Sequence, residues 1–223
     1  MPVEELLLYF LLAPAAAYGV AVVWLRWTMR RIAAHELGFL REPGVVPKFL
    51  VLLVYPTTPI VFGLVLLIQF QHVPEDSLTT GVVRSFGLAY ATVSALTVFS
   101  QAWIVVRRGA NAYRGASFAR VLILTVLPET AIVWILVIGI QVVGILMRSP
   151  TEGPLSATES DGLTRAVDFF LAGSLGAPLA ALLSNQPPSL EPGRFKNALL
   201  LGTIGTVIIA IGLFLALREI ALL

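Results

Sequence analysis

The sequence predicts an all-α integral membrane protein whose six transmembrane helices form three tandem helical hairpins. Of its 223 residues, 57% are hydrophobic and only 13% are charged, whereas a soluble domain carries about 25% charged residues. Apolar windows of membrane-spanning length recur six times along the chain, and basic residues gather in alternate connections. The windows fall at 5–25, 49–70, 82–106, 121–147, 163–184 and 197–217.

The first and the fifth windows need separate justification. Glu4 and Glu5 stand where a signal peptide would carry basic residues, and the apolar run continues to Leu25. We therefore expect a spanning helix there rather than a cleaved leader. The fifth window is the least apolar because Arg165 and Asp168 lie in its first turns.

The distribution of charge predicts the orientation. Acidic residues fill the segments on the other side of the windows, namely Glu75, Asp76, Glu152, Glu159, Asp161 and Asp168. Eleven of the fifteen basic residues lie in or beside the first, third and fifth connections: Arg26, Arg30, Arg31, Arg41, Lys48, Arg107, Arg108, Arg114, Arg120, Arg194 and Lys196. By the positive-inside rule, these three connections are cytoplasmic and both termini are extracytoplasmic in a multi-pass cell-membrane protein.

An internal repeat divides the chain into hairpins at 1–73, 74–148 and 149–223. Lys48 precedes Pro56 by eight positions, and Arg120 precedes Pro128 by eight positions. Both prolines open the pattern Pro-x-Thr-x-Ile-Val-aromatic. The third hairpin keeps the frame from Lys196 but lacks the pattern. Small residues enrich the first helix of every hairpin, which predicts a closely packed inner layer of first helices.

Glu129 is the one acidic residue deep within the apolar windows, and no other charge lies between Arg120 and Arg148. An ionised carboxylate at the bilayer centre costs about 2.5–3.5 kcal/mol on insertion scales. Such a group stays protonated, binds a cation or faces a partner, so we expect it to carry an ion. Thr57 and Gly205 occupy its position in the first and third hairpins, which leaves one acid per chain.

Helical geometry suggests neighbours for this acid. Gln101 and Glu129 lie roughly 14 residues on either side of the predicted loop centre, which places them at the same depth. Gln101 is then expected to hydrogen-bond Glu129, with Ser100 or Thr130 adding a second bond, and Thr58 lies at the equivalent depth on the preceding hairpin. The alternative for Gln101 is a purely structural contact between helices.

The tandem hairpins, the basic loops and the run Leu127-Pro128-Glu129-Thr130 resemble the proteolipid family, the c or K subunits of V-type and archaeal-type rotary ATPases. The resemblance is strongest over 94–148, weaker over 26–73, and rests on the hairpin frame over 149–223. It implies a rotor ring of several copies or paralogues in which the second-helix acid binds the transported ion. It also implies as partners a stator subunit with a buried arginine, a central-stalk subunit at the cytoplasmic loops, and lipids, but no nucleic acid.

The resemblance leaves the ion open between H⁺ and Na⁺. Sodium-type members are similar to Leu-Pro-Gly-Thr-Gln-Gly in the preceding outer helix, where Thr58 matches the threonine and Pro59 replaces the glutamine. Gln101 matches a glutamine of the inner helix, so a sodium site at Glu129, Gln101 and Thr58 remains possible, while the lost ligand favours protons. One acid per six helices gives each ion more free energy per ATP, which favours a hydrolysis-coupled pump.

Two other functions remain open. Bulky residues at the cytoplasmic ends (Trp24, Trp27, Phe99 and Trp103) and the missing acids favour a structural subunit that moves no ion. An independent proton-coupled transporter is the third candidate, although the repeats are in phase and no discontinuous helix pair is evident.

Chemistry outside ion transport has little support in the sequence. The chain has no cysteine and two distant histidines, His35 and His72, and it lacks the common phosphate-loop, nucleophile-elbow and zinc-protease motifs. We therefore expect no cofactor other than the transported ion, and no catalysis outside a larger ATPase.

Overall fold

Six helical spans make up the described part of the molecule. The computed structural model describes residues 3–74, 80–148, 155–184 and 192–223, and in these ranges it contains helices and turns but no strand. The spans long and apolar enough to cross a membrane are Glu4–His35, Val45–Phe70, Gly81–Tyr113, Gly115–Arg148, Ala157–Ser184 and Gly193–Ala221. The predicted all-α, six-span fold is confirmed. The predicted positions of Glu75, Asp76 and Glu152 lie outside the described residues.

Each span is longer than its apolar window because the helix continues into the polar residues at its ends. Arginine, which is common there, has a high helix propensity. The first span comprises α1 (Val3–Leu7), the π-helical turn η1 (Leu8–Leu12) and α2 (Ala13–His35). The others are α3 (Val45–Val54), η3 (Tyr55–Thr57) and α4 (Thr58–Phe70); α5 (Thr80–Arg108) and η5 (Gly109–Tyr113); α6 (Gly115–Leu146); α8 (Ala157–Ser174) and α9 (Gly176–Ser184); and α10 (Pro192–Ala221).

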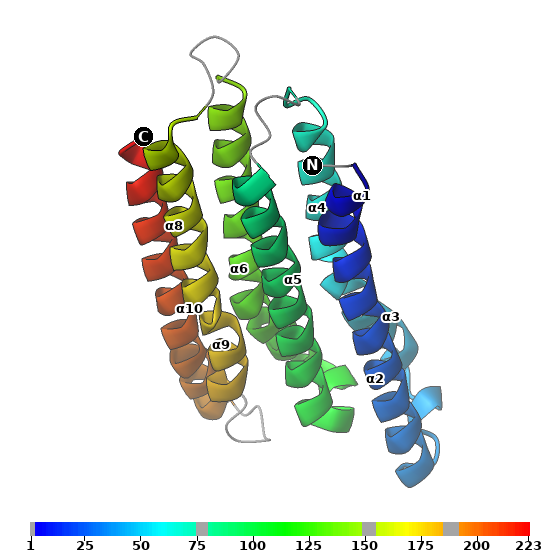
Figure 1. Ribbon diagram of the computed structural model, residues 1–223. Coiled ribbons are helices and arrows are strands. Elements are labelled where there is room, and N and C mark those ends of the chain that lie inside the picture. Colours follow the sequence, from blue (N-terminus) through cyan, green and yellow to red (C-terminus); the bar gives the residue numbers. More distant parts are fainter. Residues whose placement is uncertain (1–2, 75–79, 149–154, 185–191) are drawn as a thin grey trace.

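The helices form two rows of three (Figure 1). The first helix of each pair lies in the front row, where α5 packs against α2 on one side and against α8 and α9 on the other. The second helices lie behind and form the outer row, where α6 packs between α4 and α10. Tandem hairpins produce this arrangement when every first helix runs in the same direction.

Prolines and glycines shape the first two spans. Pro14 has no N–H for the carbonyl of Phe10, and the helix widens into the π-turn η1 just before it. Gly63 of α4 approaches that carbonyl so closely that an added Cβ would lie 1.8 Å from the Phe10 oxygen. The Phe10 ring stacks on Phe70 at 5.3 Å, between centroids, and also contacts Tyr90. The absence of a side chain at Gly63 therefore allows α4 to pack closely against the first span.

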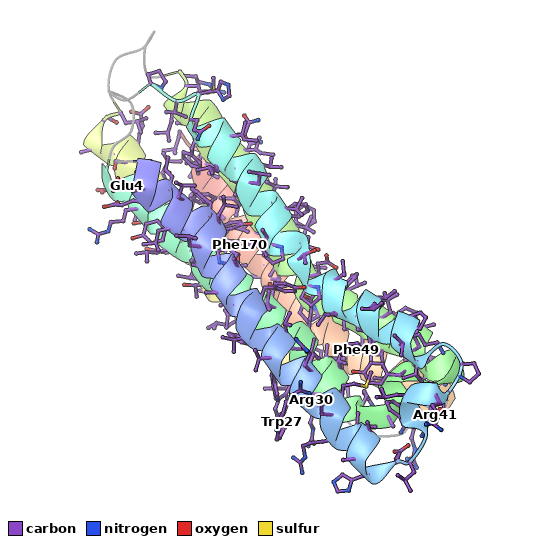
Figure 2. The ribbon with its side chains drawn as sticks, turned by 90° about the vertical axis from the view of Figure 1, so that its right-hand side faces the viewer. Glu4, Trp27, Arg30, Arg41, Phe49 and Phe170 are labelled. Atoms are coloured by element: carbon purple, nitrogen blue, oxygen red, sulfur yellow. The ribbon has the colours of Figure 1, made fainter. Side chains whose placement is uncertain are left out.

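Charge distinguishes the two ends of the bundle. Arg30 and Arg41 lie at one end and Glu4 at the other (Figure 2). Arg114 joins two connections at the basic end: its guanidinium pairs with Glu36 at 2.6 Å and also with Glu42. The hydrogen bond from Arg114 holds the pKa of the Glu42 carboxyl below its usual value of 4.5. These ion pairs fix the α2–α3 connection against the α5–α6 turn.

Candidate functional site

The second span is interrupted in the middle of the bundle. Pro56 and Pro59 each remove a backbone N–H, and the chain tightens into the 3₁₀ turn η3 between α3 and α4. The Thr58 hydroxyl lies 3.3 Å from the carbonyl oxygen of Tyr55, which Pro59 leaves without its helical donor. The two prolines thereby direct the side chains of Tyr55 and Thr58 toward α6.

Glu129 lies near the midpoint of α6, directly after the buried Pro128. The Tyr55 hydroxyl donates to its Oε2, and the Thr58 hydroxyl donates to its Oε1 at 2.7 Å. All three side chains are partly buried. Both carboxyl oxygens are therefore bound by hydroxyl groups from one neighbouring outer-row helix, as expected for Thr58.

The Gln101 side chain does not hydrogen-bond Glu129. Its amide nitrogen donates to the carbonyl of Thr125 at 3.3 Å, one helical turn before Glu129. The predicted turn centre lies near Arg114 and Gly115, about midway between Gln101 and Glu129, whereas the observed pairing of Gln101 with Thr125 is centred about two residues earlier. A shift of two residues in the turn moves the partner by four. Among the described residues, the buried Gln101 Oε1 has no hydrogen-bond partner, and it borders a small void with Tyr55 and Pro56.

The remaining two predicted residues are also directed away from the carboxyl group. The Thr130 hydroxyl donates to the carbonyl of Leu127 at 2.8 Å, within its own helix, as threonine commonly does in helix interiors. Ser100 borders a different feature, an apolar groove on the front row. Of the five predicted site residues, the structure brings Thr58 to Glu129 and does not gather Gln101, Ser100 or Thr130 there.

Tyr55 is the site residue that sequence reasoning missed. In the repeat frame it occupies the position of Leu127, so a hydroxyl-bearing side chain replaces an aliphatic one beside the motif proline. That replacement is the signal that could have identified it. Its use depends on the turn η3, which a pattern of apolar residues does not reveal.

No multidentate metal site accompanies this carboxyl group. Across residues 3–74, 80–148, 155–184 and 192–223, no three His, Cys, Asp or Glu side chains are grouped so that they could hold a metal ion. Glu129 also forms no ion pair with any basic side chain that the structure describes. The polar partners of the carboxyl group are therefore hydroxyl groups alone.

The fold and this site define a six-span α-helical membrane protein with one hydroxyl-bound carboxyl group in the middle of the bundle. Comparison of the chain with protein-family models, with curated proteins and with solved structures finds no match.

Proposed function

We propose that the chain is a rotor-ring subunit of the proteolipid type, in which Glu129 binds and releases one proton per chain. The observation that carries this proposal is the binding of both Glu129 carboxyl oxygens by Tyr55 and Thr58 from the adjacent outer-row helix. A carboxyl group retained at mid-bundle is costly unless it is neutral or well bound. Glu129 is partly exposed, so a neighbouring subunit can approach it, which supports an ion-carrying role.

Thr58 suits both protonation states of the acid. When Glu129 is ionised, the Thr58 hydroxyl donates its hydrogen to Oε1. When Glu129 carries a proton on Oε1, the acid can donate to the Thr58 oxygen, and Thr58 then donates to the Tyr55 carbonyl 3.3 Å away. A hydroxyl group offers one donor and two acceptor positions, so this exchange needs only its rotation. The two states therefore share one arrangement of heavy atoms.

Rotation would supply the change of environment. Facing lipid, the acid stays protonated because burial in an apolar medium disfavours the ionised form. Facing a stator subunit with a buried arginine, the acid releases its proton and is stabilised as an anion. Alternation between the two environments would couple rotation to directional transport, with other ring copies or paralogues and a central-stalk subunit as partners. One acid per six helices favours ATP hydrolysis-driven pumping.

The geometry favours H⁺ over Na⁺ as the ion. A hard cation prefers several oxygen ligands converging on one point. Among the described residues, the side chains that hydrogen-bond the Glu129 carboxyl are two hydroxyl groups, and the Gln101 amide instead bonds the Thr125 carbonyl one turn away. A sodium site at Glu129, Gln101 and Thr58 would require Gln101 to leave the Thr125 carbonyl.

Carbodiimide labelling of native membranes, with mass spectrometry to locate the adduct, tests the proposal. Carbodiimides react with the protonated acid, so we expect selective modification of Glu129 that high pH slows and that Na⁺ leaves unchanged. Glu129→Gln is the matched variant that should abolish labelling. Protection by Na⁺ would identify a sodium site instead. Absence of reaction at every pH would favour a structural subunit.

A second candidate, an independent proton-coupled transporter, is favoured by the interruption η3 facing Glu129, because interrupted helices commonly line transport sites. The isolation of a detergent-stable ring would support the rotor subunit. Proton uptake by proteoliposomes that contain this chain alone, abolished by Glu129→Gln, would support the transporter.

A further inference from the structure

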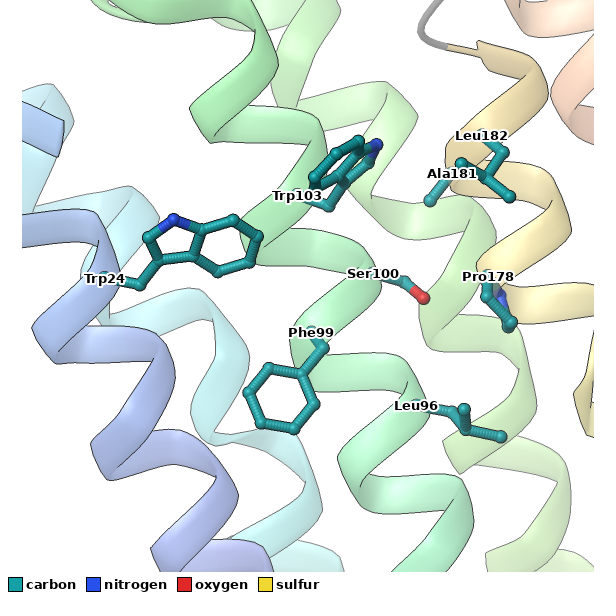
Figure 3. Close-up of a pocket in the computed structure, with 8 residues that line it drawn as sticks. All are labelled: Trp24, Leu96, Phe99, Ser100, Trp103, Pro178, Ala181 and Leu182. Atoms are coloured by element: carbon teal, nitrogen blue, oxygen red, sulfur yellow. The ribbon is translucent and has the colours of Figure 1, made fainter.

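The front row of helices carries an apolar groove that the proposed ion site does not use. The groove has a volume of about 330 Å³ and is lined by residues from three helices: Trp24 of α2, Leu96, Phe99, Ser100 and Trp103 of α5, and Pro178, Ala181 and Leu182 of α9 (Figure 3). Ser100 is its one polar lining residue. The Trp24 and Trp103 rings form the α2 side, with centroids 5.9 Å apart.

The shape of the groove follows the helix axis. Its α5 residues are spaced at i, i+3, i+4 and i+7, which is one vertical stripe on a helix. Its α9 residues are spaced at i, i+3 and i+4, which gives a parallel stripe on the opposite wall. A groove that runs along membrane-spanning helices lies along the membrane normal. An extended acyl chain has this direction and this chemistry.

Fixed contacts hold the groove open. Arg108 is only 3% exposed, and its Nη2 donates to the Ser184 carbonyl at 2.7 Å. This bond ties the end of α9 to α5 just beyond the groove. This bond therefore helps to set the spacing between α5 and α9 at that end of the groove.

A cation lies where a lipid headgroup would be. Arg107 is exposed, follows Trp103 by one helical turn, and places its guanidinium carbon 5.7 Å from the centre of that ring. Arg31 lies over Trp27 at 4.7 Å on the neighbouring helix. Among the described residues, no carboxylate lies within ion-pairing distance of Arg107. Tryptophan followed by arginine is typical of the membrane–water interface, and basic pockets between spans bind anionic headgroups.

We propose that this groove binds one anionic phospholipid, with an acyl chain between α2, α5 and α9 and the phosphate at Arg107. The binding site is independent of Glu129 and of the proposed ion transport. A second copy of the chain could cover the same apolar surface, and it would then keep lipid out of the groove.

Quenching of tryptophan fluorescence by brominated lipids tests this inference. A full-length Trp27→Phe, Trp134→Phe chain retains only Trp24 and Trp103, both in the groove. In vesicles, we expect brominated phosphatidylglycerol to quench the pair half-maximally at about one-fifth of the mole fraction that brominated phosphatidylcholine needs, the preference one interfacial arginine supplies. Arg107→Gln should remove this preference.

Arg41→Gln is the matched control, because it removes one positive charge from the same end of the bundle on the side away from Trp27 (Figure 2). It should leave the preference intact. Equal quenching by the two lipids in the parent chain would overturn the proposal, as would an equal loss of preference in both variants. If neither lipid quenches the pair, protein covers the groove and the proposal is wrong.

Discussion

The outer-row helices α6 and α10 occupy equivalent places in the predicted repeat, yet their contacts differ in kind. At the Glu129 position, α6 meets a polar turn of the neighbouring span through Tyr55 and Thr58. At the corresponding Gly205, α10 meets α9 backbone to backbone, and an added Cβ would lie 2.2 Å from the Gly176 oxygen. A second pair, Gly173 and Gly212, continues this glycine seam.

This difference explains why α10 has no acid at the position of Gly205. A carboxylate needs space and hydrogen-bond donors, and the interrupted span beside α6 supplies both. The glycine seam supplies neither, since close backbone packing is what holds helices together in lipid. One junction is therefore built for a polar side chain and the other for tight packing.

The largest effect is expected in the glycine seam. Gly205→Ala places a methyl group against the Gly176 carbonyl and the Ala180 backbone, so the helices must separate. We expect a loss of about 3 kcal/mol in stability, the upper range for overpacking, measured as thermal unfolding in detergent. Gly144→Ala on α6 is the control, because no atom lies within 4 Å of its added Cβ. An unchanged Gly205→Ala protein would mean that the seam is not tightly packed.

An intermediate effect is expected at the polar junction. Tyr55→Phe and Thr58→Val each remove one donor to Glu129, which should cost about 1 kcal/mol of stability. Each substitution frees one carboxyl oxygen from its hydroxyl partner, so carbodiimide should label Glu129 faster. Thr130→Val is the matched control, since its hydroxyl bonds within α6. If Thr130→Val speeds the labelling as much as Thr58→Val, the assignment of donors is incorrect.

A smaller effect is expected at Gln101. Gln101→Leu removes one 3.3 Å bond to the Thr125 carbonyl but also a buried oxygen without a partner among the described residues. These changes oppose each other, so stability should change by less than about 1 kcal/mol, and labelling of Glu129 should keep its pH profile. If Na⁺ slowed the labelling of Glu129 in the parent chain but not in this variant, Gln101 would be identified as a sodium ligand.

The smallest effect is expected in the stability of the α2–α3 connection at acid pH. Arg114 lowers the pKa of Glu42 below 4.5, so the folded state favours the ionised carboxylate. The resulting stabilisation is complete above the unfolded pKa and is lost as the pH falls through the folded one. Protection from hydrogen exchange at residues 36–44, corrected for the intrinsic exchange rate at each pH, should therefore fall below about pH 4.5, and Arg114→Gln should remove this dependence. Persistence of the dependence in the variant would assign it to another group.

Sequence patterns were sufficient for the coarse fold. The six spans follow from apolar length, because a bilayer requires about twenty apolar residues per helix whatever the tertiary packing. Glu129 was also identifiable as a site residue, since an ionisable side chain within a membrane span is energetically unfavourable and usually serves a function. Thr58 was predicted as its neighbour from the repeat frame alone.

The tertiary structure decided which side chains meet. Depth estimates depend on the centre of a turn, and a two-residue error there moved Gln101 from Glu129 to Thr125. The rotation of each helix, which no window of hydropathy records, turned Thr130 onto its own backbone and Ser100 toward the groove. Tyr55 reaches Glu129 because two prolines reshape one turn. Composition and period thus determined the helices, whereas helix rotation and turn geometry determined the site.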